Sequence, residues 1–129
     1  MTSSSEGDNE RTISGLAQAV KEFADARDWN QFHDPKNLTM SLASEVGELA
    51  AVLRWVRGDD ADTLVASGPH RDALEAEIGD IGICLLLLCA RVHIDLGTAV
   101  LAKLRTNAVK YPVEMSRGRA DPPNKISNR

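Results

Sequence analysis

The sequence has little of what marks a secreted, membrane-spanning or nucleic-acid-binding protein. Its 129 residues include two cysteines, and aromatic residues make up 4% of the chain. Lysine and arginine together number 15 against 19 acidic residues, which gives a formal net charge of −4 at pH 7. Because nucleic acid phosphates bind to basic stripes, this charge argues against a nucleic acid polymer as a partner. The apolar content of 43% is ordinary for one globular domain with a hydrophobic core.

The two cysteines offer neither a disulfide nor a CxxC metal or redox site. Cys84 and Cys89 are five residues apart. On a helix their side chains would point about 140° away from each other, since each residue turns the chain by ~100°. We expect both to be reduced thiols in the core of a cytoplasmic protein.

No apolar segment is long enough to cross a membrane. The longest apolar run, Ile81–Ala90, is half of the roughly 20 residues that a spanning helix needs. The first ten residues, MTSSSEGDNE, contain no apolar stretch of the kind found in a secretory signal. We therefore expect a buried helix around residue 85, a cytoplasmic location and no membrane partner.

Strand patterns are also missing, and apolar residues recur instead at helical spacing. Asp34-Pro35 and Asp95 are typical of helix starts. The four helices predicted from these signals cover residues 12–28, 35–57, 70–92 and 96–111, with one further helical turn near 62–66. Helices with mostly short connections predict an all-α protein, a four-helix bundle-type domain.

The predicted domain covers residues 11–113 and is flanked by two tails. Residues 1–10 are small and polar and are expected to be disordered, and residues 114–129, which contain paired prolines, to be flexible. In the third helix, Ile83, Leu86 and Leu87 lie on the face opposite the main apolar stripe. A helix that is apolar all round must be covered all round. One four-helix domain hardly does that, so the sequence predicts a homodimer or homotetramer.

Two pairs of acidic residues interrupt the apolar patterns. The second predicted helix contains EVGEL from residue 45, and the third contains EIGD from residue 77. On a helical projection Glu45 falls inside the apolar arc and Glu48 at its edge, while Glu77 and Asp80 border the apolar stripe of their helix. None of the four lies on a fully solvated face.

A glycine separates the two acids of each pair. Gly47 and Gly79 stand in helix interiors, where glycine costs roughly 0.5–1 kcal/mol relative to alanine. The close approach of another backbone or of a ligand is a common reason for such a glycine. Both glycines therefore favour a crowded or ligand-binding surface at the acids.

The four acids are candidates for a metal site. An ionised carboxylate at a core edge is costly unless it is paired or metal-bound, and no lysine or arginine lies within one turn of Glu45. Mg²⁺ prefers oxygen ligands and often bridges substrate phosphates. A di-iron bundle is a second interpretation, but it usually needs a Glu-x-x-His motif, and His33, His70 and His93 lie outside both pairs. Two ordinary charge clusters remain the alternative without a metal.

Other side chains are suited to a nucleotide. Lys103, Asn107 and Tyr111 recur every four residues and offer a cation for phosphate, an amide for a base or sugar, and a phenol. Taken alone, this stripe is equally an ordinary solvated helix edge.

The aromatic residues cluster near the ends of the second predicted helix. Trp29 and His33 precede it and Trp55 lies near its end, and aromatic rings stack on bases. Lys36 and Asn37 open this helix, where the backbone N–H groups favour anions. A core or interface position is the alternative for each tryptophan, and a hydrogen-bonding loop position for His33.

These segments resemble a known family. EVGEL followed about thirty residues later by EIGD resembles the ExxE…ExxD signature of the all-α, MazG-like nucleoside triphosphate pyrophosphatases. The segments FADARDWNQFHDPKNL, GELAAVLRW and AVLAKLRTNAVKYP look like the deoxycytidine triphosphate pyrophosphatase branch of that family. The resemblance covers residues 16–112.

The resemblance implies a helical oligomer that hydrolyses a nucleoside triphosphate, above all dCTP or a modified dCTP, to the monophosphate and pyrophosphate with Mg²⁺, or with Mn²⁺ as a substitute. The metal ligands of the family map onto Glu45, Glu48, Glu77 and Asp80. Its base and sugar contacts map onto Trp29, His33, Trp55, Asn107 and Tyr111, with Lys103 near the phosphates. The chain departs from many members at Ser44 and Ala76, where they have a further glutamate.

The expected chemistry is in-line attack of water on a phosphorus. Glu48 is the candidate general base and Glu45 the second catalytic carboxylate. No serine, cysteine or histidine nucleophile arrangement competes with them. One alternative is the same reaction on dUTP or another non-canonical nucleotide. The other is a non-enzymatic helical protein whose acids bind a metal or a partner protein.

Overall fold

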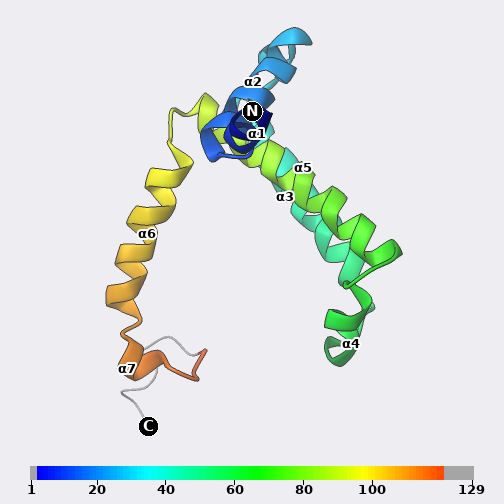
Figure 1. Ribbon diagram of the computed structural model, residues 1–129, viewed down its shortest axis with the longest axis vertical. Helices are drawn as coiled ribbons and strands as arrows, with labels where there is room; N and C mark the ends of the chain where they lie inside the picture. Colours follow the sequence, from blue (N-terminus) through cyan, green and yellow to red (C-terminus); the bar gives the residue numbers. More distant parts are fainter. Residues whose placement is uncertain (1–2, 121–129) are drawn as a thin grey trace. The chain divides into compact units, whose positions relative to one another are not determined.

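The computed structural model describes residues 3–120, and every regular element in that range is helical (Figure 1). The elements are α1 (Ser3–Glu10), α2 (Ile13–Ala26), the 3₁₀ helix η1 (Trp29–Phe32), α3 (Pro35–Leu53), α4 (Gly58–Leu64), α5 (Pro69–Arg91), α6 (Leu96–Lys110) and α7 (Val113–Ser116). The all-α class is therefore confirmed. α2, α3, α5 and α6 correspond to the four helices predicted from apolar spacing.

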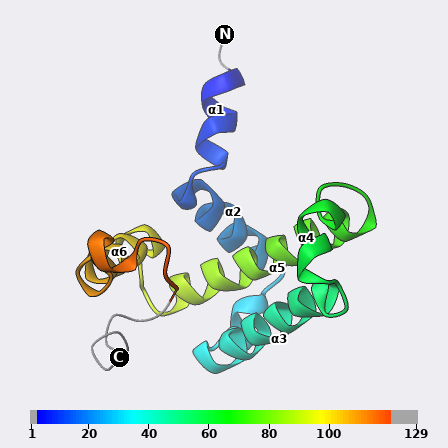
Figure 2. The same ribbon diagram turned by 90° about the horizontal axis from the view of Figure 1, so that it is seen from below.

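The chain divides into two compact units at the junction between Ile94 and Asp95. In the first unit, α3 and α5 run side by side and α2 packs on α5 (Figures 1 and 2). Ala24 of α2 and Leu38 of α3 are 1% and 3% exposed, and no other side chain from residue 7 to 120 is fully buried. The packing of α3 along α5 is what brings the two acid-bearing helices together.

Much apolar surface of the first unit stays open to solvent. The exposed fraction is 43% for Leu16 and 48% for Phe23 on α2, 48% for Val46 on α3, and 54% for Ile78 on α5. Large exposed apolar side chains that form a contiguous patch typically mark a site where another molecule binds. Packing within the first unit thus leaves these side chains available for further contacts.

The start of α3 follows the sequence signal, and its end does not. Asp34 caps the helix by accepting a hydrogen bond from the Asn37 N–H at 2.9 Å. The helix was expected to reach residue 57 but ends at Leu53, because the Val56 N–H donates to the Leu53 carbonyl in a tight turn. The short helix expected at 62–66 is α4 at Gly58–Leu64. Trp55 therefore lies in a turn and is 89% exposed.

Residues 3–10 form α1, where the sequence predicts a disordered tail. Its end packs closely on the first turn of α2, where a Cβ on Gly15 would collide with the Asn9 carbonyl oxygen. Thr12 links the two helices, since its hydroxyl donates to the Asn9 carbonyl at 2.8 Å and accepts from the Gly15 N–H at 3.0 Å. Local hydrogen bonds and a glycine thus order a segment without an apolar face. Residues 121–129 of the predicted C-terminal tail lie outside the described range.

The second unit contains α6 and α7. α6 begins as predicted, with the Asp95 carboxylate accepting from the Thr98 N–H at 2.8 Å. It ends at Lys110, and the Tyr111 N–H still donates to the Asn107 carbonyl at 2.7 Å. Within residues 3–120 no single helix is long and apolar enough to cross a membrane; α5 and α6 meet that criterion only when taken together across their break.

Candidate metal centre and nucleotide site

Three carboxylates converge between α3 and α5. Glu45 and Glu48 come from α3 and Glu77 from α5, and one oxygen of each lies within 4.8 Å of the others. Glu45 and Glu77 are half-buried and Glu48 is exposed, in agreement with their places on the helical projection. Asp80, the fourth predicted ligand, is exposed and lies outside this group. We call Glu45, Glu48 and Glu77 the carboxylate cluster.

The carboxylate cluster lacks a counter-charge. Burial raises the pKa of Glu45 and of Glu77 above the ordinary value of 4.5, and the charges of Glu48 and then Asp80 raise both pKa values further. None of the ion pairs among the described residues involves these acids. The nearby Cys84 thiol also has a raised pKa, through burial and then the charges of Glu45 and Asp80.

The donor set fits a hard divalent cation. The Oε2 atoms of Glu45 and Glu77 are buried and have no hydrogen-bond partner. Buried carboxylate oxygens are costly unless they are paired or coordinate a metal. All three groups are oxygen donors, which Mg²⁺ and Ca²⁺ prefer, and no histidine joins the cluster among the described residues. The residues that the structure describes therefore place no Glu-x-x-His partner at this cluster for a di-iron site.

Gly47 and Gly79 do not have the close neighbours expected for them. A Cβ built on either residue would meet nothing within 4 Å. No other backbone of the described residues approaches either glycine, and the alternative of a ligand at these positions stays a prediction. The helix surface beside the cluster is open instead.

A second group of predicted residues lies at the beginning of α3. The ring centroids of Trp29 and Phe23 are 5.6 Å apart in an edge-to-face arrangement, and those of Trp29 and His33 are 6.4 Å apart. The Arg27 guanidinium lies 3.6 Å from the Phe23 ring centroid. His33 Nδ1 is buried and has no hydrogen-bond partner. The structure thus brings Trp29 and His33 together.

A cavity of about 230 Å³ adjoins this aromatic group, between α2, η1 and the end of α5. Its polar lining consists of Lys21, Asp25, Asn30, His33 and Arg91. Of these five residues, the sequence patterns indicated His33 alone as a site residue. The i, i+4 spacing of Lys21 and Asp25 was the available signal, but it is common on solvated helix surfaces.

At the start of α3, where the sequence predicts an anion site, one backbone N–H group already has a partner. The Asn37 N–H donates to Asp34, and its side-chain amide donates to the Phe32 carbonyl at 3.1 Å. The carboxylate of Asp34 therefore occupies the end of the helix where an anion was expected. Asn37 has a capping role, and Lys36 is exposed.

Trp29 and Trp55 lie at opposite ends of α3. The helix has 19 residues, which corresponds to a length of about 28 Å at 1.5 Å per residue. Two rings so far apart cannot stack on the same base. Trp29 and Trp55 of one chain therefore cannot both stack on one base, and the predicted base contacts of the two rings stay predictions.

The three residues predicted on the last long helix are found in the second unit. Lys103 and Asn107 lie on α6, and Tyr111 follows its last residue. Asn107 is half-buried, and the Lys110 ammonium lies 5.3 Å from the Tyr111 ring centroid. The backbone bond from the Tyr111 N–H to the Asn107 carbonyl joins these two residues at the end of α6, and their roles stay predictions.

The chain is similar to proteins named dCTP pyrophosphatase 1. It is 44% identical over 112 residues to the Bos taurus protein and 40% identical over 108 residues to the Homo sapiens protein, matches that cover 87% and 84% of this chain. It spans 66% and 64% of their lengths, just under two thirds. Among solved structures, a pyrophosphatase from Archaeoglobus fulgidus is 36% identical with a TM-score of 0.72, covering 78% of this chain and 92% of that one.

The chain belongs to the MazG-like pyrophosphatase family. No protein-family model matches it. Membership of the MazG-like pyrophosphatases confirms the resemblance drawn from the EVGEL and EIGD segments. The roles of individual residues at the site stay predictions.

The raised pKa values predict how pH affects the stability of this MazG-like pyrophosphatase without metal. A raised pKa means that the folded state binds these protons more tightly than the unfolded state. The resulting stabilisation is fully present below pH 4.5 and is lost as pH rises through the raised values. Glu77→Gln removes one such group. In EDTA, the Tm of Glu77→Gln minus the Tm of wild type should therefore become more positive as the pH rises from 4.5 to 8. Thermal unfolding followed by circular dichroism measures this difference.

Glu75→Gln is the matched control for this measurement. Glu75 lies on the same helix and pairs with Arg71 at 2.8 Å, away from the carboxylate cluster. The Tm difference between Glu75→Gln and wild type should not increase in this way with pH. Added Mg²⁺ should raise the Tm of wild type more than that of Glu77→Gln. A metal binds the deprotonated carboxylate of Glu77, and glutamine has no such group. A Glu77→Gln difference that is independent of pH would contradict the prediction.

Proposed function

We propose that the protein is a nucleoside triphosphate pyrophosphohydrolase that converts dCTP, or a modified dCTP, to the monophosphate and pyrophosphate. The observation that supports this most is the carboxylate cluster without a counter-charge. It occurs in a chain that is 40–44% identical to proteins named dCTP pyrophosphatase 1. A helical protein whose acids only bind a partner would not need half-buried, unpaired carboxylates facing each other across two helices.

Glu45, Glu48 and Glu77 would bind the metal, with Asp80 at the margin of the site. Mg²⁺ is the proposed ion and Mn²⁺ a substitute, because both are hard cations that accept carboxylate ligands. Such an ion, when bound, neutralises triphosphate charge and lowers the pKa of water. The same ion would supply the charge that Glu45 and Glu77 lack.

Glu48 is the proposed general base. It is the exposed member of the cluster, so a water molecule and a phosphate group can both reach it. Its carboxylate would accept a proton as the water attacks a phosphorus in line. The P–O bond between the α- and β-phosphate groups breaks, and pyrophosphate leaves. Glu45 and Glu77 would fix the position of the triphosphate, since their helices pack together.

Trp29 and His33 are the proposed base contacts, with Lys36 at the entrance of the site. Asn107 and Tyr111 would contact the base or sugar, and Lys103 the phosphates. Trp55 is separated from Trp29 by the whole length of α3, so a site that uses both needs Trp55 of a second protomer. The exposed apolar side chains of α2, α3 and α5 support such an assembly. We propose a homodimer or homotetramer.

The proposed location is the cytoplasm. Both Cys84 and Cys89 are free thiols and half-buried. Free thiols are typical of reducing compartments, where nucleoside triphosphates are also found.

Pyrophosphate release from a panel of nucleotides tests the proposed function. Purified protein with Mg²⁺ would be given dCTP, CTP, dUTP, dTTP, dATP and dGTP, and we expect dCTP to have the highest kcat/KM. A site that hydrogen-bonds a base edge can reject other bases strongly. Preference for dUTP would instead support the alternative substrate. No release from any nucleotide would support a non-enzymatic protein.

A further inference from the structure

η1, the 3₁₀ helix that contains Trp29, is too short to fix its own orientation. η1 has four residues, and 3₁₀ helices of this length have weak internal hydrogen bonds. The residue before it, Asp28, has a φ of 53°, in the left-handed region that non-glycine residues seldom adopt. The orientation of η1 must therefore be fixed by contacts with its neighbours.

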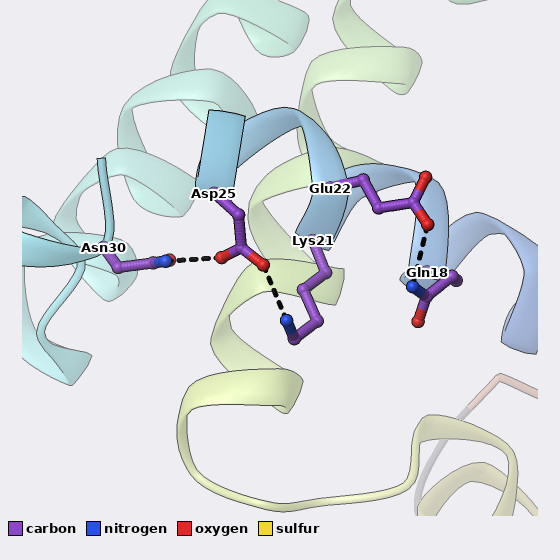
Figure 3. Close-up of polar contacts among 5 residues, drawn as sticks. All are labelled: Gln18, Lys21, Glu22, Asp25 and Asn30. Atoms are coloured by element: carbon purple, nitrogen blue, oxygen red, sulfur yellow. Dashed lines mark hydrogen bonds and ion pairs between the residues drawn. The ribbon is translucent and has the colours of Figure 1, made fainter. Parts of the chain in front are cut away.

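The first of these contacts comes from α2 (Figure 3). The Lys21 ammonium lies 2.6 Å from Asp25 Oδ2, and the Asn30 side-chain amide donates to Asp25 Oδ1 at 2.5 Å. These two hydrogen bonds hold the pKa of Asp25 below its usual range, the bond from Lys21 having the larger effect. Asp25 therefore connects the last turn of α2 to η1.

The second contact comes from the end of α5. Arg91 Nη1 donates to the Asn30 carbonyl at 3.4 Å. Within the described part of the chain, it is the only side-chain hydrogen bond that joins residues more than five positions apart. The same carbonyl accepts from the His33 N–H at 3.2 Å. Asn30 is thus held by two helices, through its amide and through its carbonyl.

We propose that Asp25 and Arg91 are positioning residues that hold Trp29 and His33 in place for binding of the substrate base. This rests on the proposed function, in which these two rings contact the base. Trp29 directly precedes Asn30, and His33 is bonded to its carbonyl, so a shift of Asn30 moves both rings. The cavity beside them is lined by the same polar residues.

The Lys21–Asp25 ion pair is exposed, so removing Asp25 should affect the position of η1 and not the stability of the whole chain. The side chains of Lys21 and Asp25 are 60% and 40% exposed, and exposed ion pairs contribute little to overall stability. Removing Asp25 should therefore leave the helices folded and free η1. A loss of substrate affinity without unfolding is the expected result.

Steady-state kinetics with dCTP test this proposal. Asp25→Ala and Arg91→Ala should each raise KM about tenfold, from the loss of one charge-assisted hydrogen bond. kcat should stay within about twofold, because only binding is weakened. Asp25→Asn keeps an oxygen acceptor for Asn30 and should restore most of the affinity. Glu22→Ala is the matched control, since Glu22 accepts only from Gln18 of its own helix, at 2.9 Å.

Fluorescence gives a readout that needs no activity. In a Trp55→Phe background, where Trp29 is the remaining tryptophan, Asp25→Ala and Arg91→Ala should increase quenching of Trp29 by acrylamide, and Glu22→Ala should not. Unchanged KM and quenching in both alanine variants, or equal changes in Glu22→Ala, would overturn the proposal. An inactive wild type would refute the proposed function alone, because quenching would still show whether Asp25 and Arg91 hold Trp29. If Asp25→Ala does not fold, the KM and quenching values of Arg91→Ala and Asp25→Asn test the proposal in its place.

Discussion

Replacing Glu45 with glutamine is expected to lower kcat/KM for dCTP by at least roughly 10²- to 10³-fold, the usual cost of removing one group that stabilises transition-state charge. Glutamine keeps the shape of the side chain and removes the negative charge that would bind the cation. The measurements are initial rates of pyrophosphate release and calorimetric titration with Mg²⁺, whose affinity should fall together with the rate.

The fold should survive this change, which separates loss of the site from loss of structure. Glu45 is half-buried beside Glu48 and Glu77, and its Oε2 has no hydrogen-bond partner. Removing its charge relieves repulsion, so the metal-free variant should be at least as stable as wild type. Glu75→Gln, with the same chemical change on α5 outside the cluster, should keep full activity. Wild-type turnover by Glu45→Gln would exclude it as a metal ligand.

Trp55→Ala is expected to raise KM for dCTP roughly 10- to 100-fold, since stacking on one base is worth about 1–3 kcal/mol. The ring is 89% exposed, so its removal should not disturb the packing of the chain. Stability measured by denaturant unfolding of the isolated chain should be unchanged. An unaltered KM would remove Trp55 from the substrate site.

Mixing two defective variants tests whether the site is shared between protomers. Glu45→Gln and Trp55→Ala chains, refolded together in equal amounts, form mixed pairs. If Trp55 serves the carboxylates of its partner, each mixed pair has one intact site and one doubly altered site. At dCTP concentrations well below the wild-type KM, where Trp55→Ala is also slow, the mixture should then recover about a quarter of the wild-type rate, as expected for random pairing in a two-fold symmetric dimer. Activity equal to the mean of the two parents would place Trp55 and Glu45 of one chain in the same site.

The features that the sequence predicted well depend on local chemistry. Apolar spacing located the long helices, and the capping residues Asp34 and Asp95 fixed two of their starts. The position of Glu45 within the apolar arc predicted its partial burial, and the match of EVGEL to EIGD predicted that acids of two helices would meet. The burial of Glu45 follows from helical periodicity, the helix starts follow from capping chemistry, and the meeting of the acids follows from the packing of α3 on α5.

The features that the sequence did not predict depend on one local structure replacing another or on contacts between residues distant in sequence. Val56 continued the apolar stripe of α3, but a tight turn at Leu53 ended the helix earlier. α1 has no apolar face that would indicate a helix. Its packing depends on the close contact between Asn9 and Gly15, which the sequence pattern does not show. The bond from Arg91 to Asn30 joins residues 61 positions apart, so no local pattern could indicate it.

The scarcity of fully buried side chains has a practical consequence. Ala24 and Leu38 alone reach that state among residues 7–120, while large apolar groups on α2, α3 and α5 remain open. Under the proposed assembly, folding and association are then coupled, and the apparent stability of a chain depends on its concentration. Dilution would then shift the protein toward separate, poorly stabilised protomers. An activity assay at low enzyme concentration would therefore report the extent of assembly as well as the rate of hydrolysis.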